Sequence, residues 1–215
     1  MSYMSEHRHS PYDNTHFSRF FHPTKGQHMI KVMPGGLYCT DEEEIICTGL
    51  GSCIAACMWD PFAKVGGMNH FLLPFDNSNQ ARHWHPDEIV STASRYGSHA
   101  MEMLINALLA KGAVRSGLKV KLFGGAQMLG RHSMIGAKNV EFILNYVQQE
   151  RLEVEAHDLG GIEPRKIMFE PTTGKAWLKR IAFNEVHHLQ HEEEKYARKL
   201  DEESHRPHDD DVELF

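Results

Sequence analysis

Two apolar runs separated by a short breaker lie near the middle of the chain, and they constrain its fold more than any other feature. "IAACMW" covers residues 54–59, "MNHFLLP" covers residues 68–74, and "DPFAKVGG" stands between them. Runs this short, bounded by Asp, Pro and Gly, are typical of strands rather than helices. The breaker predicts an antiparallel hairpin. Such a hairpin folds His70 back toward Cys53, the residue that precedes the first run.

Strand-like and helix-like segments alternate on both sides of this hairpin. Apolar residues recur at helical spacing over 93–111 and again over 139–150, which predicts two helices. Short β-type runs predict further strands at residues 28–33, 43–48, 118–123 and 152–158, with a second hairpin formed by 165–171 and 175–183. This order predicts an α+β fold, a layered α/β sandwich with mixed, largely antiparallel sheets and two main helices.

The two ends of the chain differ from its middle in composition. Residues 1–27 are polar and aperiodic, so we expect a disordered N-terminal extension. Residues 185–215 are rich in charge and histidine, and we expect a tail that is partly helical or disordered. One domain over residues 28–184 is therefore expected between two extensions.

Charge and cysteine usage exclude several classes of protein. The net charge is −6, and no block of Lys and Arg is interleaved with aromatic residues, so we do not expect a nucleic-acid partner. No apolar run reaches the ~18 residues of a membrane span, and the first residues lack signal-peptide architecture, so we expect a cytoplasmic protein without membrane insertion. All four cysteines fall within residues 39–57 without a CxxC pair, which favours free thiols over disulfides or structural zinc.

Cys53 is the strongest candidate for chemistry. It ends the small-residue turn "TGLGSC", in which Gly49, Gly51 and Ser52 permit close backbone approach and leave N–H groups that can stabilise an oxyanion. Taken alone, a cysteine among apolar residues is more often a small buried hydrophobe. His70 interrupts an otherwise apolar strand, and a histidine beside a cysteine is the basic unit of acyl-transfer catalysis. A buried structural histidine is the competing interpretation of His70.

Other patterns give weaker hypotheses. "GLGS" resembles a dinucleotide-binding loop, but an isoleucine occupies the third small position of that motif. The histidine pairs His83 with His85 and His187 with His191 lack a recognisable third ligand, and the acidic run at 208–213 is typical of a solvated end. We therefore expect neither a metal site nor a cofactor.

Five blocks of sequence, taken in order, resemble the CheD family of chemoreceptor glutamine deamidases. They are "TGLGSCIAACMWDP", "GGMNHFLLP", "KLFGGAQM", "IGAKNVEFILNYV" and "EAHDLGGIEPRKIMFEPTTGKAWL", spread over roughly residues 29–182. The resemblance implies a single-domain cysteine-hydrolase-like fold. It also implies an enzyme that converts selected glutamines of methyl-accepting chemotaxis receptors to glutamates through a thioester, without a cofactor.

The resemblance also assigns the site. The family's nucleophile falls on Cys53 and its histidine on His70, whereas its third member, a threonine, falls near Thr48 without a clean match. Thr48, Cys47 or a different group completes the triad. The glycines of "FGGAQM" (123–128) permit close approach of a substrate, although tight packing explains them as well.

The same resemblance leaves two kinds of partner and one alternative function. Besides the receptors, a CheC-type phosphatase is a possible partner that the residues themselves do not address. A non-catalytic adaptor that binds receptors or such a phosphatase is the alternative function. An adaptor gains nothing obvious from keeping both Cys53 and His70, which argues for the enzyme.

Overall fold

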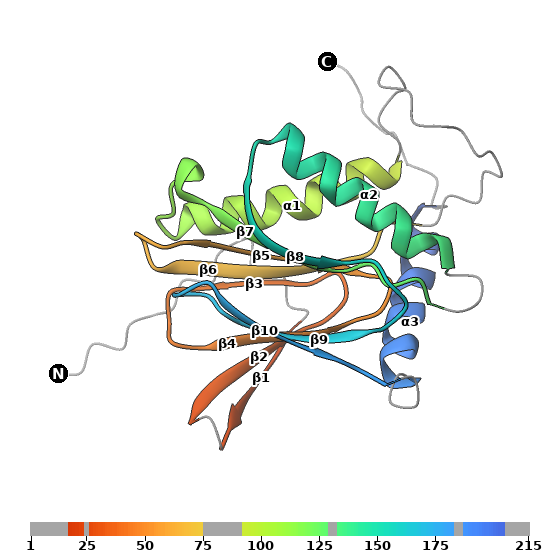
Figure 1. The fold of residues 1–215 in the computed structure, drawn as a ribbon, viewed down its shortest axis with the longest axis horizontal. Helices are drawn as coiled ribbons and strands as arrows, with labels where there is room; N and C mark the ends of the chain where they lie inside the picture. Colours follow the sequence, from red (N-terminus) through yellow and green to blue (C-terminus); the bar gives the residue numbers. More distant parts are fainter. Residues whose placement is uncertain (1–16, 24–25, 75–91, 129–132, 183–186, 205–215) are drawn as a thin grey trace, which may run out of the picture.

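A computed structural model describes residues 17–23, 26–74, 92–128, 133–182 and 187–204, and its ribbon shows two stacked sheets with helices on one outer face (Figure 1). The first sheet has the strand order β1-β2-β4-β9-β10, and the second has the order β3-β6-β5-β7-β8. The first comprises β1 (Phe17–His22), β2 (Gln27–Val32), β4 (Ile45–Leu50), β9 (Arg165–Glu170) and β10 (Lys175–Arg180). The second comprises β3 (Leu37–Thr40), β6 (Val65–Phe71), β5 (Ile54–Asp60), β7 (Lys119–Gly124) and β8 (Glu153–Leu159).

Three helices complete the described part of the fold. α1 (Thr92–Ala110) and α2 (Ser133–Gln149) cover the outer face of the second sheet, whereas α3 (His187–Ser204) lies at one end of both sheets (Figure 1). Most strand pairs are antiparallel, and β2–β4 and β7–β8 are parallel. The α+β sandwich with mixed sheets and two main helices is thus confirmed, with α3 added to it.

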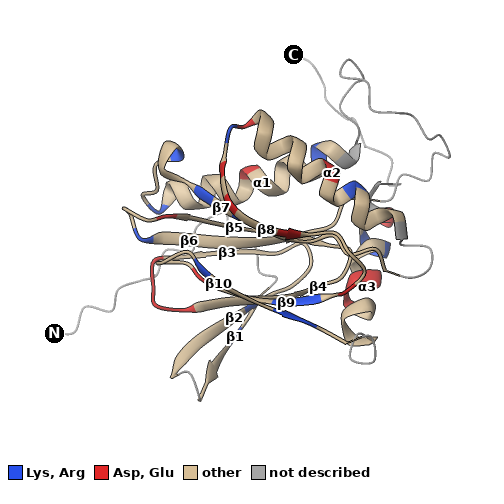
Figure 2. Cartoon of the chain, in the orientation of Figure 1, with Lys and Arg blue, Asp and Glu red and all other residues tan. Residues whose placement is uncertain are grey.

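The central hairpin of the second sheet is buried on both faces. Every residue of β5 and β6 is buried, because the first sheet covers one face and the helices cover the other. Apolar side chains of β5 therefore alternate between two cores, with Ile54 and Met58 toward the helices and Ala55 and Cys57 toward the first sheet. β6 carries no charged side chain (Figure 2), in keeping with this position.

The predicted hairpin is confirmed, and its register brings the candidate residues together. Ala55 pairs with His70 across the β5–β6 ladder, so His70 stands next to the chain that leaves Cys53. The predicted helices and the second hairpin are confirmed as α1, α2 and β9–β10.

The N-terminal segment departs from the prediction of disorder. Residues Phe17–His22 form β1, which pairs with β2 in antiparallel register. The ring of Phe17 packs edge-on against Tyr38, and Arg19 forms an ion pair with Glu44. Contacts with residues distant in sequence therefore stabilise a strand that the local sequence pattern does not predict. His83, His85 and the acidic run at 208–213 lie outside the described residues.

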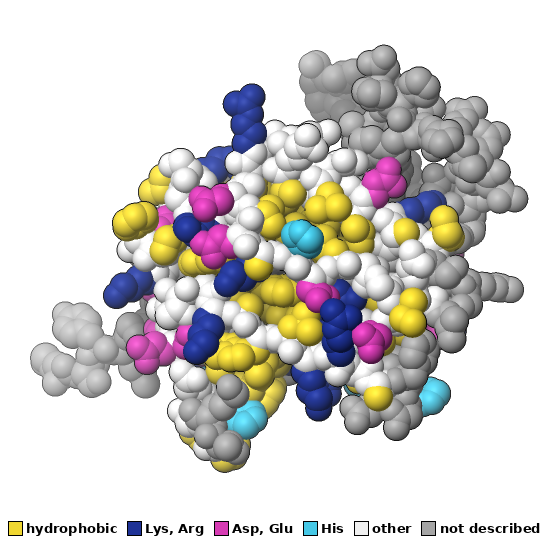
Figure 3. All heavy atoms as spheres, in the orientation of Figure 1, with side chains coloured by type: hydrophobic (Ala, Val, Ile, Leu, Met, Phe, Trp, Pro, Cys, Tyr) yellow, Lys and Arg dark blue, Asp and Glu magenta, His cyan; other side chains and the backbone are white. Residues whose placement is uncertain are grey.

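The outer surface mixes charges of both signs. On the face shown in Figure 3, Lys and Arg are interspersed with Asp, Glu and hydrophobic side chains. Among the helices that the structure describes, none combines the length and apolar character needed to cross a bilayer.

Candidate active site

Cys53 lies in the turn by which the chain leaves β4 in the first sheet and enters β5 in the second. Hydrogen bonds hold the carbonyl groups of this turn from the side of β7 and α2. The N–H of Gly125 donates to the Cys53 carbonyl at 2.8 Å, and Asn139 Nδ2 donates to the Ser52 carbonyl at 2.7 Å. With the carbonyls engaged there, the N–H groups of residues 51–53 are left to form a separate cradle of donors.

The cradle holds the carboxylate of Glu193, which comes from α3. The N–H groups of Gly51 and Cys53 donate to its Oε1 at 2.7 and 3.3 Å. The N–H and hydroxyl of Ser52 both donate to its Oε2 at 2.9 Å. Three backbone donors converging on one carboxylate form an oxyanion hole in geometry, and Glu193 is only 6% exposed.

His70 is oriented by Thr48. The Thr48 hydroxyl donates to the Val32 carbonyl at 2.8 Å, and its oxygen lies 2.8 Å from His70 Nδ1. Because the Thr48 hydroxyl donates its hydrogen to Val32, its oxygen accepts a hydrogen bond from the N–H at Nδ1 of His70. The neutral ring then carries its lone pair on Nε2, which has no hydrogen-bond partner among the described residues. A base with its acceptor nitrogen unoccupied is suited to withdraw a thiol proton.

Cys47 occupies a different environment from its neighbour Thr48. Side chains alternate along a strand, so consecutive residues of β4 face opposite sides of the first sheet. Thr48 contacts His70 between the sheets. Cys47 lines an outer cavity of about 610 Å³ together with Lys31, Trp177 and, on α3, Leu189 and Glu192; Thr48 also borders this cavity, but its hydroxyl is bonded to Val32 and His70. Of the two alternatives, the contact with His70 therefore belongs to Thr48.

The burial of the site and the carboxylate of Glu193 both disfavour ionisation of Cys53. Burial raises the pKa of Cys53 well above its usual value, and the adjacent Glu193 carboxylate raises it further. Burial lowers the pKa of His70 to about 4, although Glu193 opposes part of that change. At neutral pH both groups are uncharged, so Cys53 is a thiol and not a thiolate in this arrangement.

Cys53, His70 and Glu193 also bring a sulfur, a nitrogen and an oxygen within 4.8 Å of one another. These are ligand atoms that zinc accepts. The backbone N–H groups around the carboxylate, however, present positive partial charge, which favours an anion over a cation. The donor set therefore fits an oxyanion site better than a metal site.

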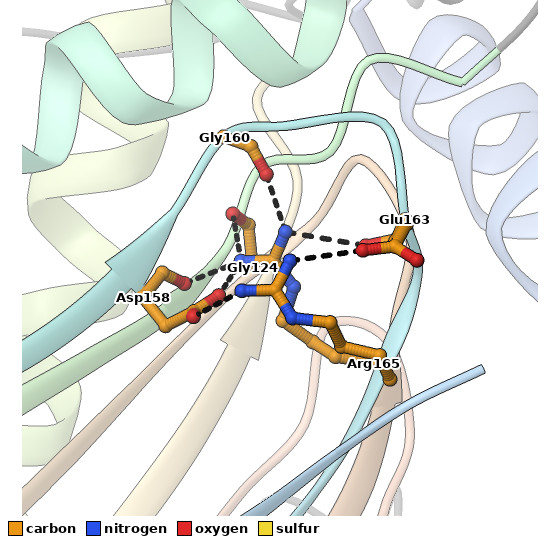
Figure 4. Close-up of polar contacts among 6 residues, drawn as sticks. Gly124, Asp158, Gly160, Glu163 and Arg165 are labelled. Atoms are coloured by element: carbon orange, nitrogen blue, oxygen red, sulfur yellow. Dashed lines mark hydrogen bonds and ion pairs between the residues drawn. The ribbon is translucent and has the colours of Figure 1, made fainter.

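Arg165 contacts the end of β7, next to the cradle, and Figure 4 shows its partners Gly124, Asp158 and Gly160. Its guanidinium donates from Nη1 to the carbonyl of Gly124 at 3.3 Å and to the Asp158 carboxylate at 2.5 Å, and from Nη2 to the carbonyl of Gly160. Its side chain is 1% exposed. The next N–H groups after Gly124 donate to the turn that contains Cys53. The glycines of "FGGAQM" thus support the turn that contains Cys53, in keeping with tight packing, one of the two explanations that the sequence left open.

Sequence reasoning missed Glu193, Arg165 and Asn139. Glu193 lies 140 positions after Cys53 in a segment that resembles a solvated helix, but Leu189, Tyr196 and Leu200 recur around it at helical spacing. That stripe was the available signal. His187 and His191 lie on the exposed side of the same helix.

Comparison with known proteins identifies the family. The profile described as "CheD chemotactic sensory transduction" matches residues 73–180, half of the chain, and begins just after His70. A relative from Vibrio vulnificus, called a probable chemoreceptor glutamine deamidase CheD, is 62% identical over 209 residues, 97% of each chain. Relatives of the same name from Vibrio cholerae and Hahella chejuensis are 55% and 42% identical, over 93% and 92% of this chain and 84% and 90% of their own. The chain belongs to the CheD family.

Proposed function

We propose that this protein is a cysteine-dependent amidohydrolase that converts glutamine side chains of methyl-accepting chemotaxis receptors to glutamates. The observation that carries the proposal is the placement of Cys53, His70 and Thr48 beside a cradle of N–H donors that holds a glutamate side chain. The names of the relatives, probable chemoreceptor glutamine deamidases, support the same substrate.

The first half of the reaction forms a thioester. His70 Nε2 accepts the proton of Cys53, and the thiolate attacks the carboxamide carbon of the glutamine. The N–H groups of Gly51 and Cys53, which now donate to one carboxylate oxygen, then donate to the tetrahedral oxyanion. His70 returns the proton to the amide nitrogen, the C–N bond breaks, and ammonia leaves.

The second half regenerates the enzyme. Water loses a proton to His70 and attacks the thioester carbon, and the C–S bond breaks to release glutamate. The Cys53 sulfur recovers its proton from His70. Throughout, Thr48 keeps the Nδ1 proton of His70 in place, so that Nε2 remains the nitrogen that exchanges protons.

The experiment compares two fully buried cysteines of the same region, Cys53 and Cys57. Wild type, Cys53→Ala and Cys57→Ala are incubated with receptor-derived peptides, and glutamine-to-glutamate conversion is measured by mass spectrometry. Conversion by wild type and Cys57→Ala but not by Cys53→Ala is expected. Equal conversion by Cys53→Ala would remove this mechanism, and binding of receptors without conversion by any chain would favour the adaptor.

The remaining assignments have narrower support. We propose a cytoplasmic location, because the four cysteines are free thiols of the kind that a reducing compartment maintains. A CheC-type phosphatase as a partner rests on the family resemblance alone. Co-purification of the two proteins from a mixture of the pure components tests that partnership.

A further inference from the structure

Helix α3 occupies the candidate active site with a side chain that is chemically identical to the product of the proposed reaction. The carboxylate of Glu193 accepts hydrogen bonds from Gly51, Ser52 and Cys53, and two of these donors, Gly51 and Cys53, are assigned above to a substrate glutamine. A glutamate formed from a receptor glutamine would end the reaction with its carboxylate at this place. Glu193 is therefore positioned as a bound product.

The surface beneath α3 is shaped to accept a helix. A Cβ atom at Gly49 would lie 2.7 Å from Leu189 Cδ1, and one at Gly51 would lie 2.8 Å from Glu193 Oε2. At Gly35 a Cβ atom would collide with the ring of Tyr196. Three glycines thus line the track of one helical stripe, and a side chain at any of them would collide with a side chain of that stripe.

The other contacts of α3 also hold the helix against this surface, and they involve residues that have no part in the proposed reaction. Lys31 Nζ lies 2.8 Å from the carboxylate of Glu192, and the hydroxyl of Tyr196 contacts that of Tyr96. Leu200 joins the core between the two sheets. Cys53 and His70 are buried to 0% and 1% exposure in this arrangement, so a glutamine cannot reach them while α3 is seated.

We propose that α3 is an intramolecular product mimic that inhibits the enzyme: it fills the groove for a substrate helix, places Glu193 in the oxyanion cradle, and must leave before a receptor glutamine enters. This inference rests on the proposed function for the identity of the product, whereas the covering of Cys53 by α3 stands independently of it. Release of α3 exposes the Cys53 thiol and removes the Glu193 carboxylate that lies next to it.

The first test makes α3 a substrate. Glu193→Gln replaces one carboxylate oxygen by an amide nitrogen at the same position. The Cys53 thiolate then attacks the side-chain carbon of residue 193, the C–N bond breaks, and ammonia departs with a proton from His70. Water cleaves the resulting thioester and leaves glutamate, so the net change is amide plus water to carboxylate plus ammonium. The reaction is unimolecular, so its rate does not depend on protein concentration.

Mass spectrometry of peptides from the full-length Glu193→Gln chain measures this conversion. The introduced glutamine is expected to become glutamate, or to remain linked to Cys53 as a thioester if water is slow to enter. The matched control, Glu194→Gln, places a glutamine on the exposed side of the same helix and is expected to stay unchanged. The proposal is overturned if position 193 is converted in a chain that also carries Cys53→Ala. It is also overturned if the Glu193→Gln chain deamidates receptor peptides but its own position 193 stays unchanged.

The second test measures access to the thiol and does not require catalysis. Glu193→Lys places a cation among N–H donors and should release α3, whereas Glu194→Lys makes the same charge change at an exposed position. Alkylation of Cys53 by iodoacetamide is expected to accelerate about tenfold or more in Glu193→Lys. The rate is proportional to the population of the open state, which is small in wild type. Glu194→Lys should match wild type.

The outcomes of the two tests separate this proposal from the proposed function. Faster alkylation together with faster deamidation of receptor peptides by Glu193→Lys supports both. Unchanged alkylation overturns the proposal even if the enzyme is active, and faster alkylation with loss of deamidation shows that Glu193 takes part in the reaction instead. Faster alkylation of Glu193→Lys, when neither this variant nor wild type deamidates receptor peptides, leaves α3 as a cover and overturns the proposed function.

Discussion

The β5–β6 hairpin and helix α3 meet at the same cradle, but they are held in the molecule in different ways. Both strands of the hairpin are buried along their whole length between the first sheet and the helices. Of the α3 residues whose side chains are described, only Leu189, Glu193 and Leu200 are buried. The hairpin therefore belongs to the core, whereas α3 covers its end through one stripe. We infer that the candidate catalytic groups are fixed and that the helix covering them is detachable.

The largest effect is expected from the hairpin itself. His70→Gln removes the group that the proposed mechanism assigns as the base for the thiol proton, and it keeps a polar side chain of similar size. Deamidation of receptor peptides should fall by about 10³-fold, the contribution typical of general acid–base catalysis. Circular dichroism and the melting temperature check that the fold persists. A variant that folds and retains wild-type activity would contradict the role of His70.

Substitutions at Thr48 and Cys47 test whether β4 of the first sheet orients His70 in the hairpin. Thr48→Val removes the acceptor for His70 Nδ1 with little change in volume, so Nε2 is no longer held as the free acceptor nitrogen. We expect a fall in kcat of about 10²-fold with KM little changed, and a displaced pH–rate profile. Cys47→Ala, on the opposite face of β4, should leave the profile unchanged. Equal losses in both variants would argue for a general weakening of β4.

The burial of His70 in the hairpin should make the stability of the protein depend on pH. Burial lowers the pKa of His70 from 6.5 to about 4, so the unfolded chain binds this proton more readily than the folded one. The free energy of unfolding that this group contributes is present above pH 6.5 and is lost as the pH falls toward 4, by about 3 kcal/mol in all. When the free energy of unfolding is measured by urea denaturation at several pH values in this range, it should change less steeply with pH for His70→Gln than for wild type. Identical slopes would mean that His70 is solvated.

The smallest effect is expected from α3. Leu189→Ala removes contact with the groove near Gly49 but leaves Glu193 in the sequence. If the seating of α3 weakens by about 1 kcal/mol, the open state gains about fivefold in population. Cys53 should be alkylated faster by that factor, while the core unfolds at the same denaturant concentration. A large loss of global stability would show instead that α3 is an integral part of the core.

The sequence predicted the hairpin better than its cover, and the reason lies in the range of the contacts. The pairing of Cys53 with His70 follows from two apolar runs and a turn, all within a short stretch of chain. The choice between Thr48 and Cys47 depends on which face of β4 looks toward the other sheet, which no local pattern specifies. The strand β1 was missed because Phe17 and Arg19 find their partners only after folding.

Glu193 was missed for a different reason. A carboxylate in a charge-rich helix normally faces water, so its residue type gives no sign of burial. Only the cradle of N–H groups, built from residues far away in sequence, makes burial of that charge favourable. Arg165 follows the same pattern, because its partners are carbonyl groups of loops whose positions are set by the sheets.

Trp177 lines the outer cavity together with Leu189 and Glu192 of α3. Indole fluorescence depends on the polarity of its surroundings, so the emission of this residue should change when the helix departs and water enters. The other described tryptophan, Trp59, is 3% exposed in the core between the sheets and should remain constant. The protein thus carries an internal optical probe, which would allow the opening of its active site to be timed without any label.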